Sequence, residues 1–484
     1  MAKRALLGVC ALLFIFLSFN ITAPEQQDAS NTVFIRDMIE CANSTTTGIN
    51  YGSWDEGTRT CTLTSNLSES VEIAVNNLTL NCAGHNITGS GSSIGILLFY
   101  NYNVTIENCD IRNFEDGISL NSSHFNTLKQ NNINNNRRGI RLNTSNFNTL
   151  VQNTVNSNYV GIDISYSTNN TLSQNTASNN YIGIFISSSL FNNLVQNIAI
   201  NSGDGIQLSF SNFTTIAQNT ANNNSNRGIL LEFSNSNTLT QNIANNNGAF
   251  GILLGESSFN TLYNNTVNNN NVEGIDLFIG NFNNTLLLNN VSNNNFGGII
   301  ILESDSNTIS NNTNNNDTNG IALISSQFNK LTYNIADNNK RRGILISNSN
   351  FNTLIQNTAS NIQEGIRLVN SYSNILTENT LNDNGFRGIY LFHSDSNILS
   401  FNNVNNNRFE GILLNFTKFN TLTGNTLINN GFGSSLSNST ENLIYNNLFS
   451  NTVNAVDHGY NIWNITKTPG INIINGSFLG GNFW

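Results

Sequence analysis

Residues 139–155 read GIRLNTSNFNTLVQNTV, and their pattern is the strongest evidence for the fold. Ile140 and Leu142 are spaced by two, and further apolar residues stand at Leu150 and Val155. A spacing of two places side chains on one face of a β-strand, whereas a helix would space them by three or four. The stretch therefore predicts three short strands that are joined by bends.

The same pattern recurs along most of the chain, which makes it a repeat. A Gly-Ile pair returns fifteen times in steps of 22–24 residues, and a leucine or isoleucine always stands two positions after that isoleucine. Self-similarity at this period indicates a solenoid. Gly433 continues the phase without its isoleucine, after glycines at Gly95, Gly117, Gly139, Gly161, Gly183, Gly205, Gly228, Gly251, Gly274, Gly298, Gly320, Gly343, Gly365, Gly388 and Gly411.

A unit this short buries its apolar residues only against copies of itself. Stacked coils do so when each adds about 4.8 Å along an axis, which is the spacing of strands in a sheet. Crossovers between parallel strands are almost always right-handed. We therefore predict an all-β fold, a single-stranded right-handed parallel β-helix of about 16–18 coils, with 22–24 residues and three short strands per coil.

The composition excludes other classes of protein. Asparagine accounts for 105 of the 484 residues and glycine for 36, and both disfavour helix interiors. The formal net charge is −10, which leaves no basic surplus for binding nucleic acid. Hydrophobic residues make up 38% of the chain and only 2 residues are proline, which argues against a disordered protein.

Two polar columns accompany the repeat. A buried amide is costly unless it is hydrogen-bonded, so asparagine in every coil predicts a ladder in which each side chain bonds its neighbours at a corner. Serine recurs six positions after the glycine, with Gly280 as a break. Asparagine recurs fourteen positions after the glycine, at Asn131, Asn153, Asn175, Asn197, Asn219, Asn242, Asn265, Asn312, Asn334, Asn357, Asn379, Asn402, Asn425 and Asn447.

The N-terminus resembles an export signal in its composition. Lys3 and Arg4 precede a weakly polar or apolar run from Ala5 to Phe19, which as a helix would reach only about 22 Å. This is too short for a membrane span, so we expect a signal peptide over 1–23 and no membrane span in the mature chain.

Four cysteines remain after that segment, and an even number in an exported chain indicates disulfides. Cys109 lies one coil before Asn131 in the asparagine column, and Cys82 precedes it by about one coil, so the two are expected to be stacked. Of the three possible pairings we therefore favour Cys41–Cys61 with Cys82–Cys109. A four-thiolate zinc site is the competing interpretation, although no C-x-x-C motif is present.

The domain organisation follows from where the repeat holds. Residues 31–70 are out of phase and predict a disulfide-bearing N-terminal cap, needed because an open stack exposes strand edges. Residues 71–450 form the β-helix, and 451–484, which lose the period, form the C-terminal cap.

Charged residues stand just before several of the glycines. Asp116 and Arg138 lie in neighbouring coils, as do Glu364, Arg387 and Glu410, and their signs alternate. Alternation is what a structural charge ladder requires, because like charges in register repel. The functional interpretation is a groove that binds sugar hydroxyl groups through these five residues.

A catalytic interpretation of the same column finds little support. Glycoside hydrolysis needs a protonated acid, but Arg387 between Glu364 and Glu410 favours two ionised carboxylates. We therefore predict no catalytic residue. No metal site or cofactor is predicted either, because the four histidines fall in different phases of the repeat.

The run Gly-Ile-x-Leu-x-x-Ser-x-x-Asn-Thr-Leu-x-x-Asn, at 139–153 and 343–357, resembles the NosD-like β-helix repeat found in archaeal and bacterial surface proteins, also described as a carbohydrate-binding and sugar-hydrolase module. The stretches 80–89 and 104–109 resemble the opening coils of such proteins. Some relatives continue beyond a motif like 481–484, which implies that the C-terminal cap is truncated here. The copper-related role of the family's named member is not carried over, because copper ligands are lacking.

Two functions from different classes follow. The first is a secreted or cell-surface rod without catalytic activity, structural, adhesive or glycan-binding, with polysaccharide or envelope components as partners. The alternative is a polysaccharide hydrolase, lyase or epimerase that uses Glu364, Arg387 and Glu410, or Asp116 and Arg138. Coil lengths that never exceed 24 residues leave no inserted loop for a substrate cleft, which favours the first.

Overall fold

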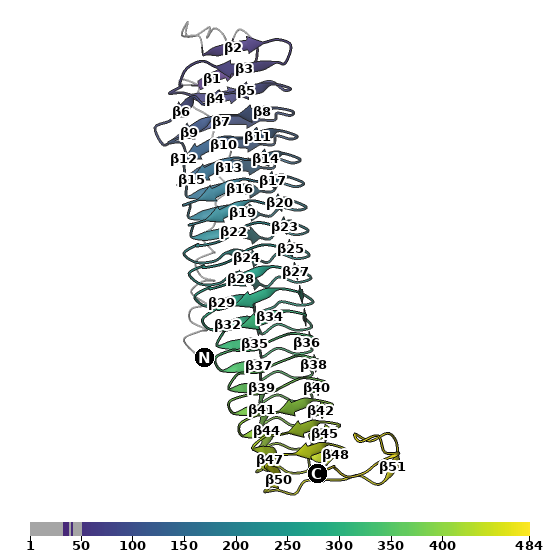
Figure 1. The fold of residues 1–484 in the computed structure, drawn as a ribbon. Helices are drawn as coiled ribbons and strands as arrows, with labels where there is room; N and C mark the ends of the chain where they lie inside the picture. The colour runs from purple at the N-terminus through teal and green to yellow at the C-terminus, as the bar shows by residue number, and fades with distance from the viewer. Residues whose placement is uncertain (1–31, 38–39, 42–50) are drawn as a thin grey trace.

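The computed structural model of the protein describes residues 32–37, 40–41 and 51–484. The chain winds into a stack of coils that forms one long rod, with the N-terminal strands at one end and β51 near the other (Figure 1). Successive coils pair in parallel, strand on strand, with nearly every pairing one repeat apart. The predicted parallel β-helix is therefore confirmed. The predicted signal peptide, 1–23, lies outside the described residues.

The first sheet, sheet A, begins at the repeat glycines and holds the longest strands. Within the described residues it has 19 strands. They are β1 (Thr32–Ile35), β4 (Ser70–Ile73), β7 (Ile94–Phe99), β10 (Asp116–Asn121), β13 (Arg138–Asn143), β16 (Val160–Ser165), β19 (Ile182–Ser187), β22 (Asp204–Ser209), β24 (Ile229–Glu232), β26 (Ile252–Gly255), β29 (Glu273–Phe278), β32 (Gly297–Leu302), β35 (Asn319–Ile324), β37 (Arg342–Ser347), β39 (Glu364–Val369), β41 (Arg387–Phe392), β44 (Glu410–Asn415), β47 (Phe432–Ser437) and β50 (Val453–Asp457).

The second sheet, sheet B, follows in each coil after a corner. Its strands are parallel except for the antiparallel pair β2–β3 at the N-terminal end. They are β2 (Gly52–Asp55), β3 (Thr60–Leu63), β5 (Thr79–Asn81), β8 (Thr105–Glu107), β11 (Thr127–Lys129), β14 (Thr149–Val151), β17 (Thr171–Ser173), β20 (Asn193–Val195), β23 (Thr215–Ala217), β25 (Thr238–Thr240), β27 (Thr261–Tyr263), β30 (Thr285–Leu287), β33 (Thr308–Ser310), β36 (Lys330–Thr332), β38 (Thr353–Ile355), β40 (Ile375–Thr377), β42 (Ile398–Ser400), β45 (Thr421–Thr423) and β48 (Leu443–Tyr445).

The third sheet, sheet C, is interrupted. Where its strands lapse, single-residue bridges such as Ile198↔Thr220 and Ile335↔Thr358 continue the stacking. A separate antiparallel pair, β51 (Thr468–Pro469) with β52 (Phe478–Leu479), follows near the C-terminus. The strands of sheet C are β6 (Asn86–Thr88), β9 (Asp110–Arg112), β12 (Asn132–Asn134), β15 (Thr154–Asn156), β18 (Thr176–Ser178) and β21 (Ile198–Ile200), then β28 (Thr266–Asn268), β31 (Asn290–Ser292) and β34 (Thr313–Asn315), then β43 (Asn403–Asn405), β46 (Thr426–Ile428) and β49 (Leu448–Ser450).

The core is the inside of the coil, filled by the residues of the repeat. Ile140, Leu142, Leu150 and Val155 are fully buried, and Ile140 stacks in register on Ile162 of the next coil. The repeat requires glycine at its first position because coils approach closely there. A Cβ on Gly161 would lie 2.4 Å from the carbonyl oxygen of Gly183, a contact that real side chains do not make.

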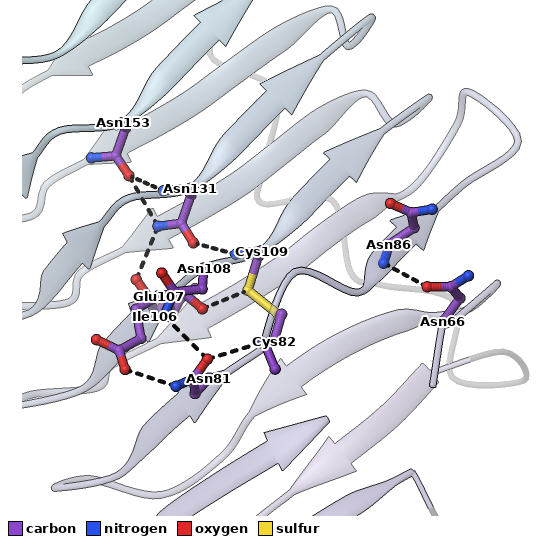
Figure 2. The surroundings of a disulfide bond; sticks show 11 residues. Asn66, Asn81, Cys82, Asn86, Ile106, Glu107, Asn108, Cys109, Asn131 and Asn153 are labelled. Carbon is purple, nitrogen blue, oxygen red and sulfur yellow. Dashed lines mark hydrogen bonds between the residues drawn. A yellow bond between two sulfur atoms is a disulfide. The ribbon is translucent and has the colours of Figure 1, made fainter. Parts of the chain in front are cut away.

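The predicted asparagine ladder is present inside the coil. Asn153 donates its Nδ2 to Oδ1 of Asn175 at 2.9 Å and to the carbonyl oxygen of Leu128 at 2.8 Å. Asn175 Oδ1 also accepts from the backbone N–H of Asn153 at 3.0 Å. Figure 2 shows the start of the column, where Asn153, Asn131 and Cys109 follow one another. Each buried amide thus forms hydrogen bonds through its own oxygen and nitrogen, and these bonds also pair backbone N–H and carbonyl groups at the corner.

Two further asparagine columns, which the sequence analysis missed, line other corners. One includes Asn126, Asn148 and Asn170, and the other includes Asn136, Asn158 and Asn180. They use the same geometry: Asn148 accepts from the backbone N–H of Asn126 at 2.8 Å. Each of these columns is stacked inside the rod and is as buried as the one predicted.

The apparent break at Gly280 is not a break in the serine column. Gly280 is an inserted residue in the left-handed conformation, with φ 70°. The next residue, Asn281, takes the column position: it accepts from the backbone N–H of Ser257 at 2.9 Å, and its own N–H donates to Ser304. The gap expected in the asparagine column is likewise filled, one position later, by Asn289.

Two disulfides tie the first coils together. Cys82 pairs with Cys109 of the next coil, with Cα atoms 4.7 Å apart, directly beneath the first rungs of the asparagine ladder (Figure 2). Cys41 pairs with Cys61 of β3. These are the pairings that the phase of the repeat favours, and they leave the four cysteines no role as thiolate zinc ligands.

The C-terminal end closes the ladders with residues that are out of period. Asn482 accepts from the backbone N–H and the Nδ2 of Asn447, and Asn461 does the same for Asn442. Trp463 and Trp484 pack near Phe449, the last large core residue of this end. Within the described residues, no helix has the length and hydropathy needed to cross a bilayer.

Candidate functional site

The charged column lies at the start of the sheet A strands. Register pairs place Asp116 beside Arg138, and Glu364 beside Arg387. The stack separates the first pair from the second by roughly 50 Å, at about 4.8 Å per coil. The structure therefore brings the five predicted residues together as two clusters and not as one site.

The amino-terminal cluster comprises Glu115, Asp116, Arg137, Arg138, Arg141 and Asp163. Arg138 Nε donates to Asp116 at 2.5 Å, and Arg141 lies 3.5 Å from the other oxygen of that carboxylate. Glu115 pairs with Arg137 and lies 3.4 Å from Arg138. Three acidic and three basic side chains thus neutralise one another.

Burial sets the electrostatics of this cluster. Burial raises the pKa of Asp163, against a hydrogen bond from Ser165 and the nearby Arg138 and Arg141. Burial is the largest single effect and works against the charged form of Arg138, but the attraction and hydrogen bond of Asp116, together with the nearby Asp163 and Glu115, outweigh it and raise the pKa of the guanidinium. The cluster favours charge pairing between Asp116 and Arg138, while burial works against the charged form of Asp163.

The carboxy-terminal cluster comprises Arg342, Glu364, Arg367, Arg387 and Glu410, with Tyr390. Glu364 lies 3.1 Å from Arg342, 3.1 Å from Arg367 and 3.3 Å from Arg387. Arg387 also binds Glu410 at 2.9 Å. The guanidinium groups of Arg367 and Arg387 both lie 4.9 Å from the centre of the Tyr390 ring.

Positive charge is crowded in the carboxy-terminal cluster. Burial lowers the pKa of Arg342, and repulsion from Arg367 and Arg341 lowers it further, against the attraction of Glu364. Sequence spacing pointed to Glu364, Arg387 and Glu410 but missed Arg367 and Tyr390. Both stand two positions after a repeat glycine, which is the signal that could have revealed them.

A second feature that the sequence analysis missed is a column of exposed phenylalanines at the corner between sheets A and B. Phe125 stacks on Phe147 with ring centres 5.0 Å apart, and Phe191 stacks on Phe213 in the same way. Their spacing of eight residues after the glycine was visible in the sequence. Beside this column the Gly280 insertion opens a shallow hollow of about 730 Å³, lined by Asn235, Glu256, Ser258, Phe259, Ile279, Gly280 and Phe282.

The comparisons with known proteins place the chain in a family. Residues 29–202 and 296–484 match the family described as "Periplasmic copper-binding protein (NosD)". The chain belongs to this family. Residues 171–314 also match the "Right handed beta helix region" family. The search of curated proteins gives no match.

Solved structures with this fold are distant from the NosD-family chain. One is the A-module of an Azotobacter vinelandii mannuronan C-5 epimerase, AlgE6, with 13% identity, a TM-score of 0.34, and coverage of 81% of this chain and 91% of that one. Another is the Streptococcus pneumoniae surface adhesin PfbA, with 14% identity, a TM-score of 0.30, and coverage of 73% and 85%. These likenesses concern the winding of the chain and not its function.

The described residues do not fit the copper that the family's description implies. No group of three or more His, Cys, Asp or Glu side chains converges among them. All four cysteines of the described region are in disulfides. His124 accepts a hydrogen bond from the backbone N–H of Asn146, and His393 stacks on Phe416, far along the rod. Soft donors, which copper prefers, are thus dispersed or occupied.

Proposed function

We propose that the protein is an exported rod without catalytic activity that binds glycans of the cell envelope along its side. The observation that carries the proposal is the mutual pairing of charges in both clusters. Glu364 accepts from three arginines on its two oxygens, and Asp116 is paired on both oxygens. Carboxylates that are held in ion pairs are poorly suited to transfer protons, but they can still accept hydrogen bonds from the hydroxyl groups of a sugar.

The regular winding supports the same proposal. Coil lengths stay within 22–24 residues, so the lateral surface is a nearly uniform wall along the rod. The insertion at Gly280, in the longest coil of the repeat, opens a shallow hollow rather than a cleft. A long repetitive wall suits binding to an extended polymer or embedding among envelope components.

Export is supported by the disulfides. Disulfides persist in oxidising compartments and are rare in the cytosol. Cys82–Cys109 and Cys41–Cys61 both join segments of the first coils, where an open end of the stack needs protection. The family's description as periplasmic agrees with this location.

The test combines binding and turnover on the purified full chain. A glycan array reports binding, and release of reducing sugars, formation of unsaturated uronates and uronate epimerisation by NMR report the three catalytic alternatives. We expect binding without turnover. Turnover that is lost in Glu410→Gln but kept in Glu378→Gln, an exposed acid at another corner that pairs with Gln356, would contradict the proposal.

A further inference from the structure

The carboxy-terminal cluster extends into a patch with surplus positive charge. Four successive coils bring six basic residues to the corner between sheets C and A and the adjoining edge of sheet A, against three acidic ones, Glu364, Asp383 and Glu410. A fourth acid, the buried Asp317 of the preceding coil, lies beside Lys340. The chain as a whole has a net charge of −10. We name this patch the basic corner; its basic residues are Lys340, Arg341, Arg342, Arg367, Arg387 and Arg408.

The basic corner offers more hydrogen-bond donors than the protein uses. Lys340, Arg341 and Arg408 are exposed. Arg367 gives its Nη1 to Glu364, while its buried Nε has no acceptor among the described residues. A buried donor without an acceptor is costly, and an anion alongside would relieve it. Arg141 Nε in the amino-terminal cluster likewise has no acceptor among the described residues, but that cluster holds three acids for its three bases.

Aromatic rings frame the same corner. Phe386 and Phe409 are 44% and 40% exposed and stack with ring centres 5.7 Å apart. The guanidinium of Arg408 lies 5.5 Å from the centre of the Phe409 ring. Exposed ring faces and edges pack well against the C–H face of a sugar ring, and guanidinium groups bind carboxylates and sulfates in bidentate fashion.

We propose that the basic corner binds an acidic polysaccharide, one that carries carboxylate or sulfate groups on its sugar rings. This inference rests on the proposed glycan-binding function and names the class of glycan. The arginines would pair with the acidic groups while Phe386, Phe409 and Tyr390 contact the rings. A nucleic acid is the disfavoured occupant, because the acidic remainder of the chain repels a long polyanion outside this corner.

The test measures the affinity of the full chain for polygalacturonate and heparin, for neutral dextran, and for single-stranded DNA, at low and at high salt. We expect the acidic glycans to bind, with an affinity that falls as salt screens the charges. Arg341→Gln with Arg408→Gln should weaken this binding by about tenfold, since exposed charges contribute at the rim of the contact. Both residues are exposed, and an unchanged melting temperature checks that the variant is folded.

A matched control removes two positive charges elsewhere. The control variant, Lys129→Gln with Lys330→Gln, removes two lysines of sheet B. It should leave the affinity for the acidic glycans within about twofold, because these lysines lie outside the basic corner. An equal loss in both double variants would overturn the inference, as would DNA binding as tight as polygalacturonate binding. Binding of dextran alone overturns the acidic assignment and leaves the proposed function standing. Binding of no glycan at all overturns both.

Discussion

Two stretches of the rod share one architecture and differ in how completely the interior is satisfied. In the regular stretch from Gly139 to Gly205, every step is 22 residues and the corner columns continue from coil to coil, with Ser202 in place of one asparagine. Asn158 there accepts from Asn136 and donates to Asn180. In the central stretch from Gly274 to Gly343, the first coil has Gly280 as an extra residue at the corner between sheets A and B, and the next coil carries an acid in the column of Asn158.

The defect in the central stretch is Asp317. Its Oδ1 accepts from the backbone N–H of Asn294 at 2.6 Å, and its own N–H donates to Asn339 at 3.0 Å, as an asparagine would. Its Oδ2, where an asparagine has its donor, has no partner among the described residues, and neither has the side-chain amide of the neighbouring Asn314. Burial raises the pKa of Asp317 to about 8.

Each interior polar column needs both a hydrogen-bond acceptor and a donor at every coil. A protonated carboxyl group is the closest substitute for an amide, because it also presents one acceptor and one donor. The column therefore tolerates Asp317 by holding a proton on it. The extra residue Gly280 is handled in another way: it is pushed outward at a corner, and Asn281 keeps the inner position.

The largest loss of stability should come from a substitution in the asparagine column of the regular stretch. Asn175→Ala removes the acceptor of the Asn153 backbone N–H and the donor to the Leu150 carbonyl oxygen. Each buried group left without a partner costs about 1–3 kcal/mol, so we expect a loss of about 3–5 kcal/mol in the free energy of unfolding, measured by denaturant titration. Gln174→Ala, one residue earlier on the exposed ladder, is the control and should cost under about 0.5 kcal/mol.

A substitution that replaces the acid in the central stretch should increase stability. The pKa of Asp317 in the folded protein, about 8, exceeds the usual aspartate value of 3.8. Protonation is thus favoured in the native state, and stability should fall as pH rises from about 4 to about 8. At pH 7 Asp317→Asn should add up to about 4 kcal/mol and remove this slope, which is about 1.4 kcal/mol per pH unit. Melting temperatures of the two proteins measured between pH 4 and 8 test this prediction. If both proteins show the same dependence on pH, Asp317 is not protonated in the folded state.

How much of the fold and of the ladders could be predicted from sequence differs from one residue to another. Isoleucine after each glycine and asparagine at Asn153 and Asn175 stand at fixed intervals, so the fold and one ladder were accessible. The columns of Asn148 and Asn158 were hidden because asparagine is too common for its positions to stand out. Asp317 is recognisable as a misplaced acid only when its column is known.

The charged clusters show a different limit. Glu364 and Arg367 are three residues apart, which in an ideal strand places them on opposite faces. They nevertheless lie 3.1 Å apart. The interval between them contains Gly365, whose position is absent from the paired residues of neighbouring strands. Alternation alone therefore could not reveal that Arg367 joins the cluster.

A smaller gain in stability is expected from a substitution at Asn314. It occupies the column that elsewhere holds small apolar residues such as Ala336 and Ala359, both fully buried. Asn314→Ala removes two polar atoms that have no partner among the described residues, so the free energy of unfolding should rise by about 1–2 kcal/mol. Urea titration measures it. A loss of stability would mean that the amide has a partner in solution, such as a buried water.

The smallest effect concerns the outward bulge. Deleting Gly280 shortens that coil by one residue and lets Asn281 keep its inner position, so we expect a change within about 1 kcal/mol. Deleting Thr144, at the same corner of a regular coil, should pull Ser145 out of its column and lower the melting temperature further. Differential scanning calorimetry compares the two. Equal losses would show that the insertion is part of the packing.

The uniform bonding between coils has a consequence for evolution. Asn153, Asn148 and Ser145 would find an asparagine or serine of the same kind if the segment 161–182 were excised, namely Asn197, Asn192 and Ser189. Duplication of such a segment would likewise meet matching partners on both sides. The length of the rod is thus a heritable quantity, adjustable in increments of about 4.8 Å while both ends stay the same.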